Sequence, residues 1–267
     1  MPTTIHPTAI VHAKAQLGAD VEIGAYSIIG EHVVLGDRCW VGPHAVIEGR
    51  TKVGSETRIW QFASVGGAPQ DLKFANEPSE LIIGSKNVIR EFVTLQLGTK
   101  HGHMKTVIGD GNLFMASSHV GHDCVVGNHN VFANSVALAG HVTVGNHVIL
   151  GGLVAVHQFS RLGDYCFLSG GAMVGEDVPP YCIGDGDRAK LRGLNLIGLK
   201  RHGFTPEQLS DIKKAYRTLF GSRGNISEKM DSLSPEFVER PHIRHLCDFI
   251  RSSKRGICNP HKQLSHA

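Results

Sequence analysis

The chain has 267 residues, enough for one or two domains, and its 32 glycines with only 6% aromatic residues fit a repeat architecture better than an ordinary globule. No apolar run approaches the ~20 residues needed to span a bilayer, and the start, Met1–Thr4, lacks a basic and then apolar leader. We therefore expect a cytoplasmic protein without stable membrane insertion, and a net charge of +3 does not suggest a nucleic-acid partner.

The charge is divided unevenly along the chain. Residues 188–267 carry 16 lysines and arginines against 7 acidic residues, a balance of +9, whereas the preceding residues carry 11 against 17, a balance of −6. A basic end suggests an acidic partner. A solvated helical surface that binds nothing is an equally good interpretation of the same residues.

Aliphatic residues recur every six positions over most of the chain, from Ile5 to Val65, from Ile83 to Leu95 and from Ile108 to Val174. A second column of small or branched residues follows each of them by four positions. This is the hexapeptide signature of a β-helix, in which both columns point inward and Gly, Asn and Asp supply corners that need positive φ. Three hexads make one triangular coil, so residues eighteen apart should stack at about 4.8 Å.

The cysteine pattern indicates structural thiols. Three of the six cysteines, Cys39, Cys124 and Cys166, fall in the inward column, and the sequence contains no CxxC. A buried cysteine acts as a small hydrophobe. We therefore expect reduced thiols rather than disulfides, a metal site or a nucleophile, and we expect no cofactor.

Two segments interrupt the hexads. The first, residues 66–78, leaves the prism as a long loop, and because long ordered loops often carry function, its Gln70, Asp71 and Lys73 are candidate ligand contacts. The second, residues 98–105, shifts the phase by one residue and contains His101 and His103. We interpret these two as surface loop histidines.

The hexads end at Val178-Pro179-Pro180, where proline removes the backbone donor that strand pairing needs. A solenoid end must be capped, and the cap reads as helical. Thr205-Pro206-Glu207-Gln208 predicts a capping box, with Ile212, Ala215, Tyr216 and Leu219 at helical spacing after it, and residues 234–250 suggest one or two more helices. We predict a mainly β protein, with a β-helix over residues 1–190 and an α-helical domain over 191–267.

The chemistry is expected at the segment Ser118–Cys124. His122 faces outward while Cys124 faces inward, and adding eighteen twice gives Gly140 and then Gln158 in the same outer column. Other polar residues come close: Asp123, which falls beneath His141 in the adjacent column, together with His119 and His157. A histidine with a pKa near 6.5 can take a proton from a hydroxyl, and a glycine N–H beside it could hold an oxyanion. The pattern therefore predicts direct acyl transfer.

The alternative is that these are ordinary exposed corner histidines, because the chain has 17 histidines in all. His129 and His147 illustrate the point. They also stack eighteen apart, but on another face without flanking site residues, and we interpret that pair as structural.

Five segments together carry a resemblance to a known family: Gln70–Lys73, His119–Cys124, Leu138–Val142, Ala155–Phe159 and Gly198–Arg201. In this order they resemble the UDP-N-acetylglucosamine O-acyltransferases of lipid A biosynthesis, over essentially the whole chain. The resemblance implies a homotrimer of left-handed β-helices, an exception to the usual right-handed crossover, with active sites in clefts between subunits.

By that resemblance His122 deprotonates the sugar 3-hydroxyl, which attacks the thioester of a 3-hydroxyacyl chain on acyl carrier protein, and the Gly140 N–H stabilises the oxyanion. The acidic carrier protein accounts for the basic end of the chain. Further residues match substrate-binding positions: Gln70, Asp71, Lys73, His119, His141, His157 and Gln158 for the sugar, phosphate or acyl hydroxyl, and Asn195 and Arg201 for the nucleotide. Gly170 stands where bulk limits acyl length, which implies a long chain near C14.

Three departures from the family pattern concern the nucleotide sugar. Gln96-Leu97-Gly98-Thr99 stands where His-Arg-Gly-Thr is common, Ile197 where an acidic residue is common, and His202 where a second arginine is common. They leave open a 3-amino UDP-sugar that is acylated on nitrogen by the same mechanism.

Other functions stay open at this point. A γ-carbonic-anhydrase-like zinc enzyme could use His119, His122 and His141 as ligands, although such a reaction needs neither the basic cap nor the Asp71 loop. A β-helical scaffold or nucleotide sensor would need none of these groups. The related N-acyltransferase of the same pathway carries an extra amino-terminal domain, for which hexads beginning at Ile5 leave no room.

Overall fold

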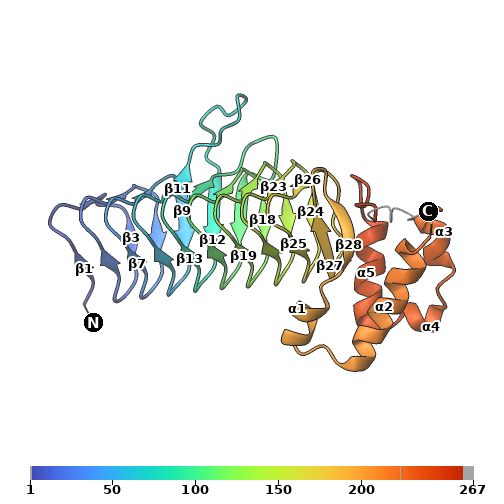
Figure 1. Ribbon diagram of the computed structural model, residues 1–267. Helices are drawn as coiled ribbons and strands as arrows, with labels where there is room; N and C mark the ends of the chain where they lie inside the picture. The colour runs from blue at the N-terminus through green and yellow to red at the C-terminus, as the bar shows by residue number, and fades with distance from the viewer. Residues whose placement is uncertain (1, 223, 261–267) are drawn as a thin grey trace.

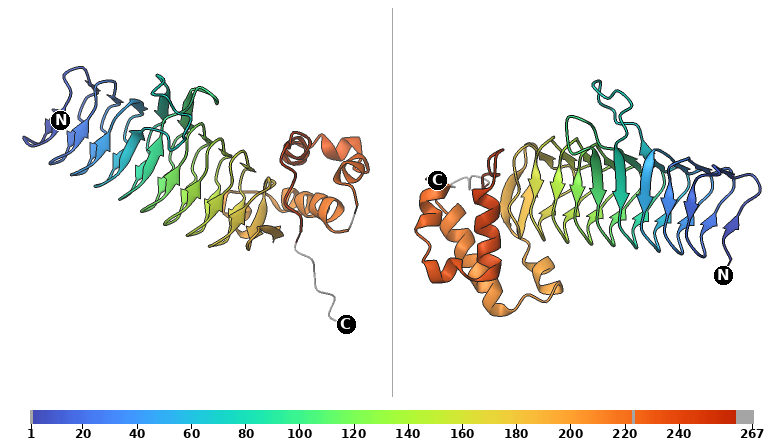
Figure 2. Two further views of the ribbon diagram at one scale, coloured as in Figure 1. Left: turned by 90° about the horizontal axis from the view of Figure 1, so that it is seen from above. Right: turned by 180° about the vertical axis from the view of Figure 1, so that it is seen from behind.

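Each hexad folds as one short strand followed by a corner. The computed structural model describes residues 2–222 and 224–260. Within them the strands form three sheets that wrap into a triangular prism and are parallel except for the last pair of the first sheet (Figure 1). The helices lie together at the end of the prism that carries the last strands, as both views in Figure 2 show.

The first sheet contains β1 (Thr4–Ile5), β4 (Glu22–Ile23), β7 (Trp40–Val41), β10 (Arg58–Ile59), β13 (Val88–Ile89), β16 (Leu113–Phe114), β19 (Val131–Phe132), β22 (Ile149–Leu150), β25 (Phe167–Leu168), β27 (Cys182–Asp185) and β28 (Lys190–Leu194). The second contains β2 (Ile10–Val11), β5 (Ile28–Ile29), β8 (Val46–Ile47), β11 (Ser64–Gly67), β14 (Thr94–Gln96), β17 (His119–Val120), β20 (Ala137–Leu138), β23 (Ala155–Val156) and β26 (Met173–Val174). The third contains β3 (Gln16–Leu17), β6 (Val34–Leu35), β9 (Arg50–Val53), β12 (Glu80–Ile83), β15 (Lys105–Ile108), β18 (Val125–Val126), β21 (Thr143–Val144) and β24 (Arg161–Leu162).

The strand register confirms the predicted coil of eighteen residues. Val120 pairs with Leu138, and Leu138 pairs with Val156. Both predicted columns are buried, as shown by Val120 in the first and Cys124 in the second, each at 0% exposure. The aliphatic axis therefore fixes every outward residue at a defined height along the prism.

The corners differ from the prediction in one respect. Most left-handed corner positions hold residues other than glycine, among them Asp123, His141 and Phe159 with φ of 59°, 61° and 64°. Some glycines, such as Gly111, have positive φ, whereas others serve close packing, because a Cβ on Gly127 would lie 2.6 Å from the carbonyl oxygen of Gly145 on the next coil. A left-handed residue costs about 1–2 kcal/mol, and inter-coil bonds such as His141 N–H to His122 O at 2.9 Å offset this cost.

Both predicted interruptions leave the prism on the same side, where Figure 1 shows two loops rising above the strands. The first lengthens one coil, because Val53 pairs with Ile83, thirty residues away. The second lengthens the next coil, because Ile83 pairs with Ile108, twenty-five residues away. A coil of four hexads would have twenty-four residues, so this coil contains one residue more. The phase shift is thus confirmed.

The helical region contains α1 (Leu196–Arg201), α2 (Pro206–Phe220), α3 (Ile226–Asp231), α4 (Pro235–Val238) and α5 (Pro241–Arg251). The capping box is confirmed: Thr205 Oγ1 accepts from Gln208 N–H at 3.3 Å, and Gln208 Oε1 accepts from Thr205 N–H at 2.9 Å. β28 pairs antiparallel with β27 and runs from Lys190 to Leu194, across the expected boundary between residues 190 and 191. Among the described residues, no helix has the length and apolar character to cross a membrane.

All six cysteines lie in the described part of the chain and are buried free thiols. Burial raises the pKa of Cys124 to about 12, so this thiol stays protonated and unreactive at neutral pH. The prediction of reduced structural thiols is confirmed.

An exposed stack of rings runs along the corner between the first and second sheets. Tyr26, His44, Phe62 and Phe92 are stacked at centroid distances of 5.1, 5.4 and 5.2 Å, and we call them the aromatic ladder. Phe62 and Phe92 expose 49% and 57% of their surface. A continuous apolar edge of this kind marks an interaction surface.

We expect Leu150→Ala, in the fully buried axis, to lower the free energy of unfolding by about 2–5 kcal/mol, because the cavity adds to the lost burial. Urea denaturation at one fixed protein concentration would measure this. Ile10→Ala is the control, because Ile10 is 64% exposed and should change stability by no more than ~0.5 kcal/mol. Equal effects of the two substitutions would contradict the assignment of the axis.

Candidate active site

The corner between the second and third sheets brings the predicted catalytic residues together. His122 and Asp123 follow β17, and the left-handed residue of each coil stacks on the next, with the rings of His141 and Phe159 parallel at 4.5 Å. The His122 side chain is 17% exposed and that of His141 is 15% exposed, so both are accessible from one side. Regular register alone therefore assembles this cluster.

Asp123 is the anchor of the corner, with a side chain that is 0% exposed. Thr99 donates its N–H to both carboxylate oxygens at 3.1 Å and its hydroxyl to Oδ2 at 2.7 Å, and His103 donates its N–H to Oδ1 at 2.8 Å. Gly102 packs so closely against the carboxylate that an added Cβ would lie 2.4 Å from Oδ1. The second loop thus closes around a buried carboxylate.

These bonds decide the charge of Asp123. Burial alone would raise the pKa of its carboxyl, but the hydrogen bonds from Thr99, His122 and His103 hold that pKa below its ordinary value. Asp123 is therefore ionised at neutral pH and can only accept hydrogen bonds.

The tautomer of His122 follows from that charge. Its Nδ1 lies 2.9 Å from Asp123 Oδ2, and an ionised carboxylate requires the nitrogen to be the donor. The Nδ1 proton is thus fixed, which leaves Nε2 as the ring nitrogen that can accept a proton. A carboxylate that orients a histidine in this way fixes the tautomer that a general base needs.

Gly140 lies against the His122 ring. A Cβ built on Gly140 would be 2.5 Å from His122 Cε1 and 2.6 Å from Nε2, so no other residue fits there without moving the ring. The Gly140 carbonyl accepts from Phe159 N–H at 3.3 Å, whereas the hydrogen bonds of the described residues give the Gly140 N–H no acceptor. His122 and Gly140 therefore meet, as their spacing predicted.

Two more predicted histidines flank this pair. The rings of His122 and His141 meet edge to face at 5.0 Å, and His119 Nδ1 lies 2.6 Å from Thr94 Oγ1. Burial lowers the pKa of His141, although Asp123 acts in the opposite direction, and burial followed by the nearby His122 lowers the pKa of His119. Both rings are neutral at pH 7 and can hydrogen-bond to a polar ligand.

The remaining predicted residues on this corner are open to solvent. His157 and Gln158 are exposed on the coil above, with His157 Nδ1 3.1 Å from the Gln158 carbonyl. Gln70 and Lys73 are exposed on the first loop, and Asp71 Oδ1 accepts the Lys73 N–H at 3.0 Å. A ligand at His122 would therefore be flanked by both sets.

Three predicted residues lie elsewhere. Gly170 is on the corner between the first and second sheets, where a Cβ would come 3.3 Å from the Gly152 carbonyl. Asn195 caps α1 and donates from Nδ2 to the carbonyl of Tyr165 at 3.0 Å, and Arg201 is the exposed last residue of that helix. Asn195 and Arg201 thus belong to the corner between the third and first sheets, not to that of His122.

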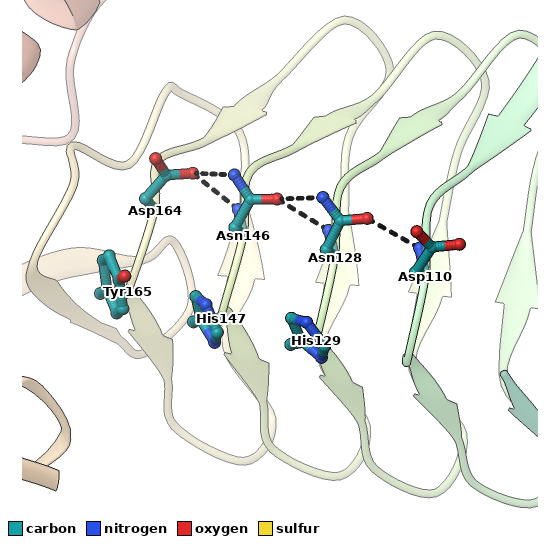
Figure 3. A pocket seen from close by; sticks show the side chains of 7 residues that line it. All are labelled: Asp110, Asn128, His129, Asn146, His147, Asp164 and Tyr165. Atoms are coloured by element: carbon teal, nitrogen blue, oxygen red, sulfur yellow. Dashed lines mark hydrogen bonds between the residues drawn. The ribbon is translucent and has the colours of Figure 1, made fainter. Parts of the chain in front are cut away.

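A hollow of about 370 Å³ opens on that third corner (Figure 3). Its polar wall is a ladder in which each side-chain oxygen accepts the N–H one coil earlier, as from Asn128 N–H to Asn146 Oδ1 at 2.8 Å. The predicted stacking of His129 on His147 is confirmed, with centroids 5.2 Å apart. His202, which follows α1, tilts against His147 at 4.5 Å. The polar groups of this wall bond mainly to one another, but the expectation that His129 and His147 have no flanking site residues was wrong, because the predicted nucleotide residues Asn195 and Arg201 lie on the same corner.

The structure also indicates which residues could hold a metal ion. Among the described residues, one set of three brings ligand atoms within 4.8 Å of one another, and it consists of His122, Asp123 and His141. The zinc ligands considered from the sequence included His119, but its Nδ1 bonds to Thr94. Asp123 Oδ2 already accepts from Thr99 and His122, so this oxygen is occupied by hydrogen bonds.

Sequence reasoning placed Asp123 beneath His141 but assigned it no role, and it did not connect Thr99 or His103 to the site. The contacts join residues twenty or more positions apart, through a loop without periodicity. The one available signal was the phase shift, which marks this loop as inserted one coil before His122, since Thr94 pairs with His119. Gln96 and Leu97, which depart from the family pattern, are buried, with 5% and 7% exposure. They therefore affect packing below the loop.

Family models match two parts of the chain. The model described as UDP N-acetylglucosamine O-acyltransferase, domain 2, matches residues 177–258. The bacterial transferase hexapeptide model of six repeats matches residues 2–37, 32–67 and 105–140. The two descriptions correspond to the prism and its cap.

Named relatives are similar over nearly the whole chain. A protein of Myxococcus xanthus named acyl-(acyl-carrier-protein)-UDP-N-acetylglucosamine O-acyltransferase is 55% identical over 95% of this chain and 98% of its own. A solved UDP-N-acetylglucosamine acyltransferase has a TM-score of 0.94 at 41% identity, covering 97% of this chain and 99% of its own. The corresponding structure from Campylobacter jejuni has a TM-score of 0.92 at 36% identity, covering 97% and 100%.

We expect His119 and His141 to titrate below the ordinary histidine value of 6.5, because burial disfavours the imidazolium form. Histidine-selective ¹³C NMR would measure this, with His119→Asn and His141→Asn to assign the two signals. Asp123→Asn should lower the pKa of His141 further, because it removes a nearby negative charge. A pKa above 6.5 for either ring would contradict the burial argument.

Proposed function

The chain belongs to the UDP-N-acetylglucosamine O-acyltransferase family, and from this premise we propose that it transfers a 3-hydroxyacyl chain from acyl carrier protein to the 3-hydroxyl of UDP-N-acetylglucosamine. This transfer is the first step of lipid A biosynthesis. The observation that carries the proposal is the His122 ring, whose Nδ1 is bonded to Asp123 and which packs against Gly140.

His122 acts as the general base in this proposal. Its Nε2 takes the proton of the sugar hydroxyl while that oxygen forms a bond to the thioester carbon. The carbon–sulfur bond of the tetrahedral intermediate then breaks, and the departing thiolate takes the proton from the imidazolium. Asp123 stabilises the imidazolium between these two steps through the 2.9 Å contact.

Gly140 supplies the oxyanion donor. Its N–H has no acceptor among the described residues and lies beside the ring that takes the proton. A donor held in place before the reaction costs no reorganisation when charge develops on the thioester oxygen. The bare Cα also leaves room for the acyl group at this point.

The surrounding polar residues bind the substrates. Gln70, Asp71 and Lys73 of the first loop, with His119, His141, His157 and Gln158 of the corner, hold the sugar, the phosphates and the acyl hydroxyl. Gly170 leaves space for a long acyl chain near C14. The basic C-terminal part of the sequence, residues 188–267, attracts the acidic carrier protein in the cytoplasm.

We infer that the site is shared between chains of a homotrimer. In one chain Asn195 and Arg201 lie on a different corner from His122, so a nucleotide sugar that reaches both needs two chains. The exposed aromatic ladder supplies an apolar edge for a neighbouring copy to cover.

The effect of the residues that depart from the family pattern is best tested by changing the sugar substrate. Ile197 is 68% exposed on α1, and His202 packs on His147, so both sit where the nucleotide contacts are expected. An amine in place of the 3-hydroxyl would use the same base and the same donor. Mass spectrometry of products formed from UDP-N-acetylglucosamine and from its 3-amino analogue separates ester from amide transfer.

We expect His122→Ala to lower the turnover of acyl transfer by about 10²–10⁴-fold, because proton removal is lost. The assay would follow product mass with UDP-N-acetylglucosamine and acyl carrier protein thioesters. His6→Ala, an exposed histidine on the first coil, is the matched control and should keep wild-type turnover. Unchanged turnover in His122→Ala would contradict the role of His122 as general base, and a wild-type protein without turnover would support a non-catalytic scaffold.

We expect chains carrying His122→Ala and chains carrying Arg201→Ala to complement each other when co-refolded, because a shared site takes the base from one chain and the nucleotide contact from its neighbour. Each variant alone should be impaired at low UDP-N-acetylglucosamine, and an equal mixture should recover up to about a quarter of wild-type activity. Mixed trimers without any recovery would place the whole site in one chain.

A further inference from the structure

The two loops that leave the prism are joined above their bases by one carboxylate. Glu77 of the first loop accepts the Lys100 N–H at Oε1 and the Ala75 N–H at Oε2, both at 2.8 Å. Within residues 2–222 and 224–260, this is the one side-chain hydrogen bond between residues 68–79 and residues 98–104. Each oxygen of Glu77 therefore serves a different loop.

Residues of each loop lie near the corner of His122: the charge of Asp71 acts on His141, and Thr99 and His103 bond to Asp123. On the first loop, Asp71 and Lys73 lie a few residues before Glu77, and Asp71 Oδ1 accepts the Lys73 N–H. On the second loop, Thr99 directly precedes Lys100 and binds Asp123 through both its N–H and its hydroxyl. Successive N–H groups of the second loop thus bond to the catalytic carboxylate and to Glu77.

The second loop is a compact unit that can transmit this link. The Thr99 carbonyl accepts from both Gly102 N–H and Met104 N–H at 3.1 Å, and Gly102 packs against the Asp123 carboxylate. A displacement of Lys100 would therefore move Thr99 and change the bonds that hold Asp123. The same backbone bond from Lys100 is the main reason that the pKa of Glu77 lies below its ordinary value, which keeps the carboxylate charged.

We propose that Glu77 is a positioning residue that couples the sugar-binding loop to the Thr99 clamp on Asp123, so that a bound nucleotide sugar tightens the orientation of His122. This inference rests on the proposed function. It assigns to Glu77 no contact with substrate, because its two oxygens are already bonded to backbone N–H groups. The effect is transmitted through three short steps, from Glu77 to Lys100, from Thr99 to Asp123, and from Asp123 to His122.

Kinetics of three variants test the role. Glu77→Ala should lower kcat/KM for UDP-N-acetylglucosamine by about 10–100-fold, with both kcat and KM affected, because a small misplacement of reacting groups is costly. Glu77→Gln keeps one acceptor and should fall in between. Glu56→Ala is the control and should match wild type. It removes an exposed carboxylate that pairs with Arg38, on a different corner from either loop.

A double-mutant cycle with Thr99→Val separates positioning from a general loss of structure. If Glu77 acts through the clamp, the double variant Glu77→Ala, Thr99→Val should be little worse than Thr99→Val alone. Effects of the two substitutions that multiply independently would overturn the proposal. Thermal unfolding should show Glu77→Ala within a few degrees of wild type, and Glu77→Gln carries the test if the alanine variant does not fold.

Hydrogen exchange provides a readout that does not depend on turnover. UDP-N-acetylglucosamine should slow exchange in residues 68–79 and 98–104 of the wild-type protein, but only in residues 68–79 of Glu77→Ala. Equal protection of the second loop in both proteins would overturn the coupling. A wild-type protein that binds the sugar nucleotide but transfers no acyl chain would contradict the proposed function and leave the coupling measurement intact.

Discussion

The eighteen-residue register is the constraint on which the rest of this molecule depends. Aliphatic residues can fill a narrow triangular axis only if each coil lies directly on the last, and pairings such as Val120 with Leu138 show that it does. Once that is so, each outward residue has a fixed neighbour one coil away. His122 therefore meets Gly140, and Asp123 meets His141, without any dedicated contact to bring them together.

The same register gives the three corners different characters. One stacks the rings of the aromatic ladder on the outside, and one forms a ladder of Asn and Asp side chains that bond from coil to coil (Figure 3). The corner of His122 alone receives two inserted loops (Figure 1). A repeated backbone thus provides equivalent positions, and the side chains and insertions decide which of them carries chemistry.

The insertions supply what a regular coil lacks. A corner residue on a prism is exposed to water, where a carboxylate next to a histidine is screened and free to move. The loop of residues 98–104 covers Asp123 with three donors, so the carboxylate is buried yet ionised and holds one tautomer of His122. The orientation of His122 is therefore fixed, through Asp123, by hydrogen-bond donors from outside the repeat.

Sequence alone determined the prism, its inward columns, the capping box at Thr205 and the proximity of His122, Gly140 and His141, because a fixed period converts spacing directly into neighbours. It assigned positive φ to Gly, Asn and Asp, whereas the structure also places aromatic and other side chains there and uses many glycines for close approach between coils. Only the tertiary structure decided that Thr99 and His103 hold Asp123, that Glu77 joins the two loops, and that Asn195 lies on another corner from His122. Those contacts arise where the chain leaves the period, and there hydrogen bonds between distant segments, not spacing, decide which residues meet.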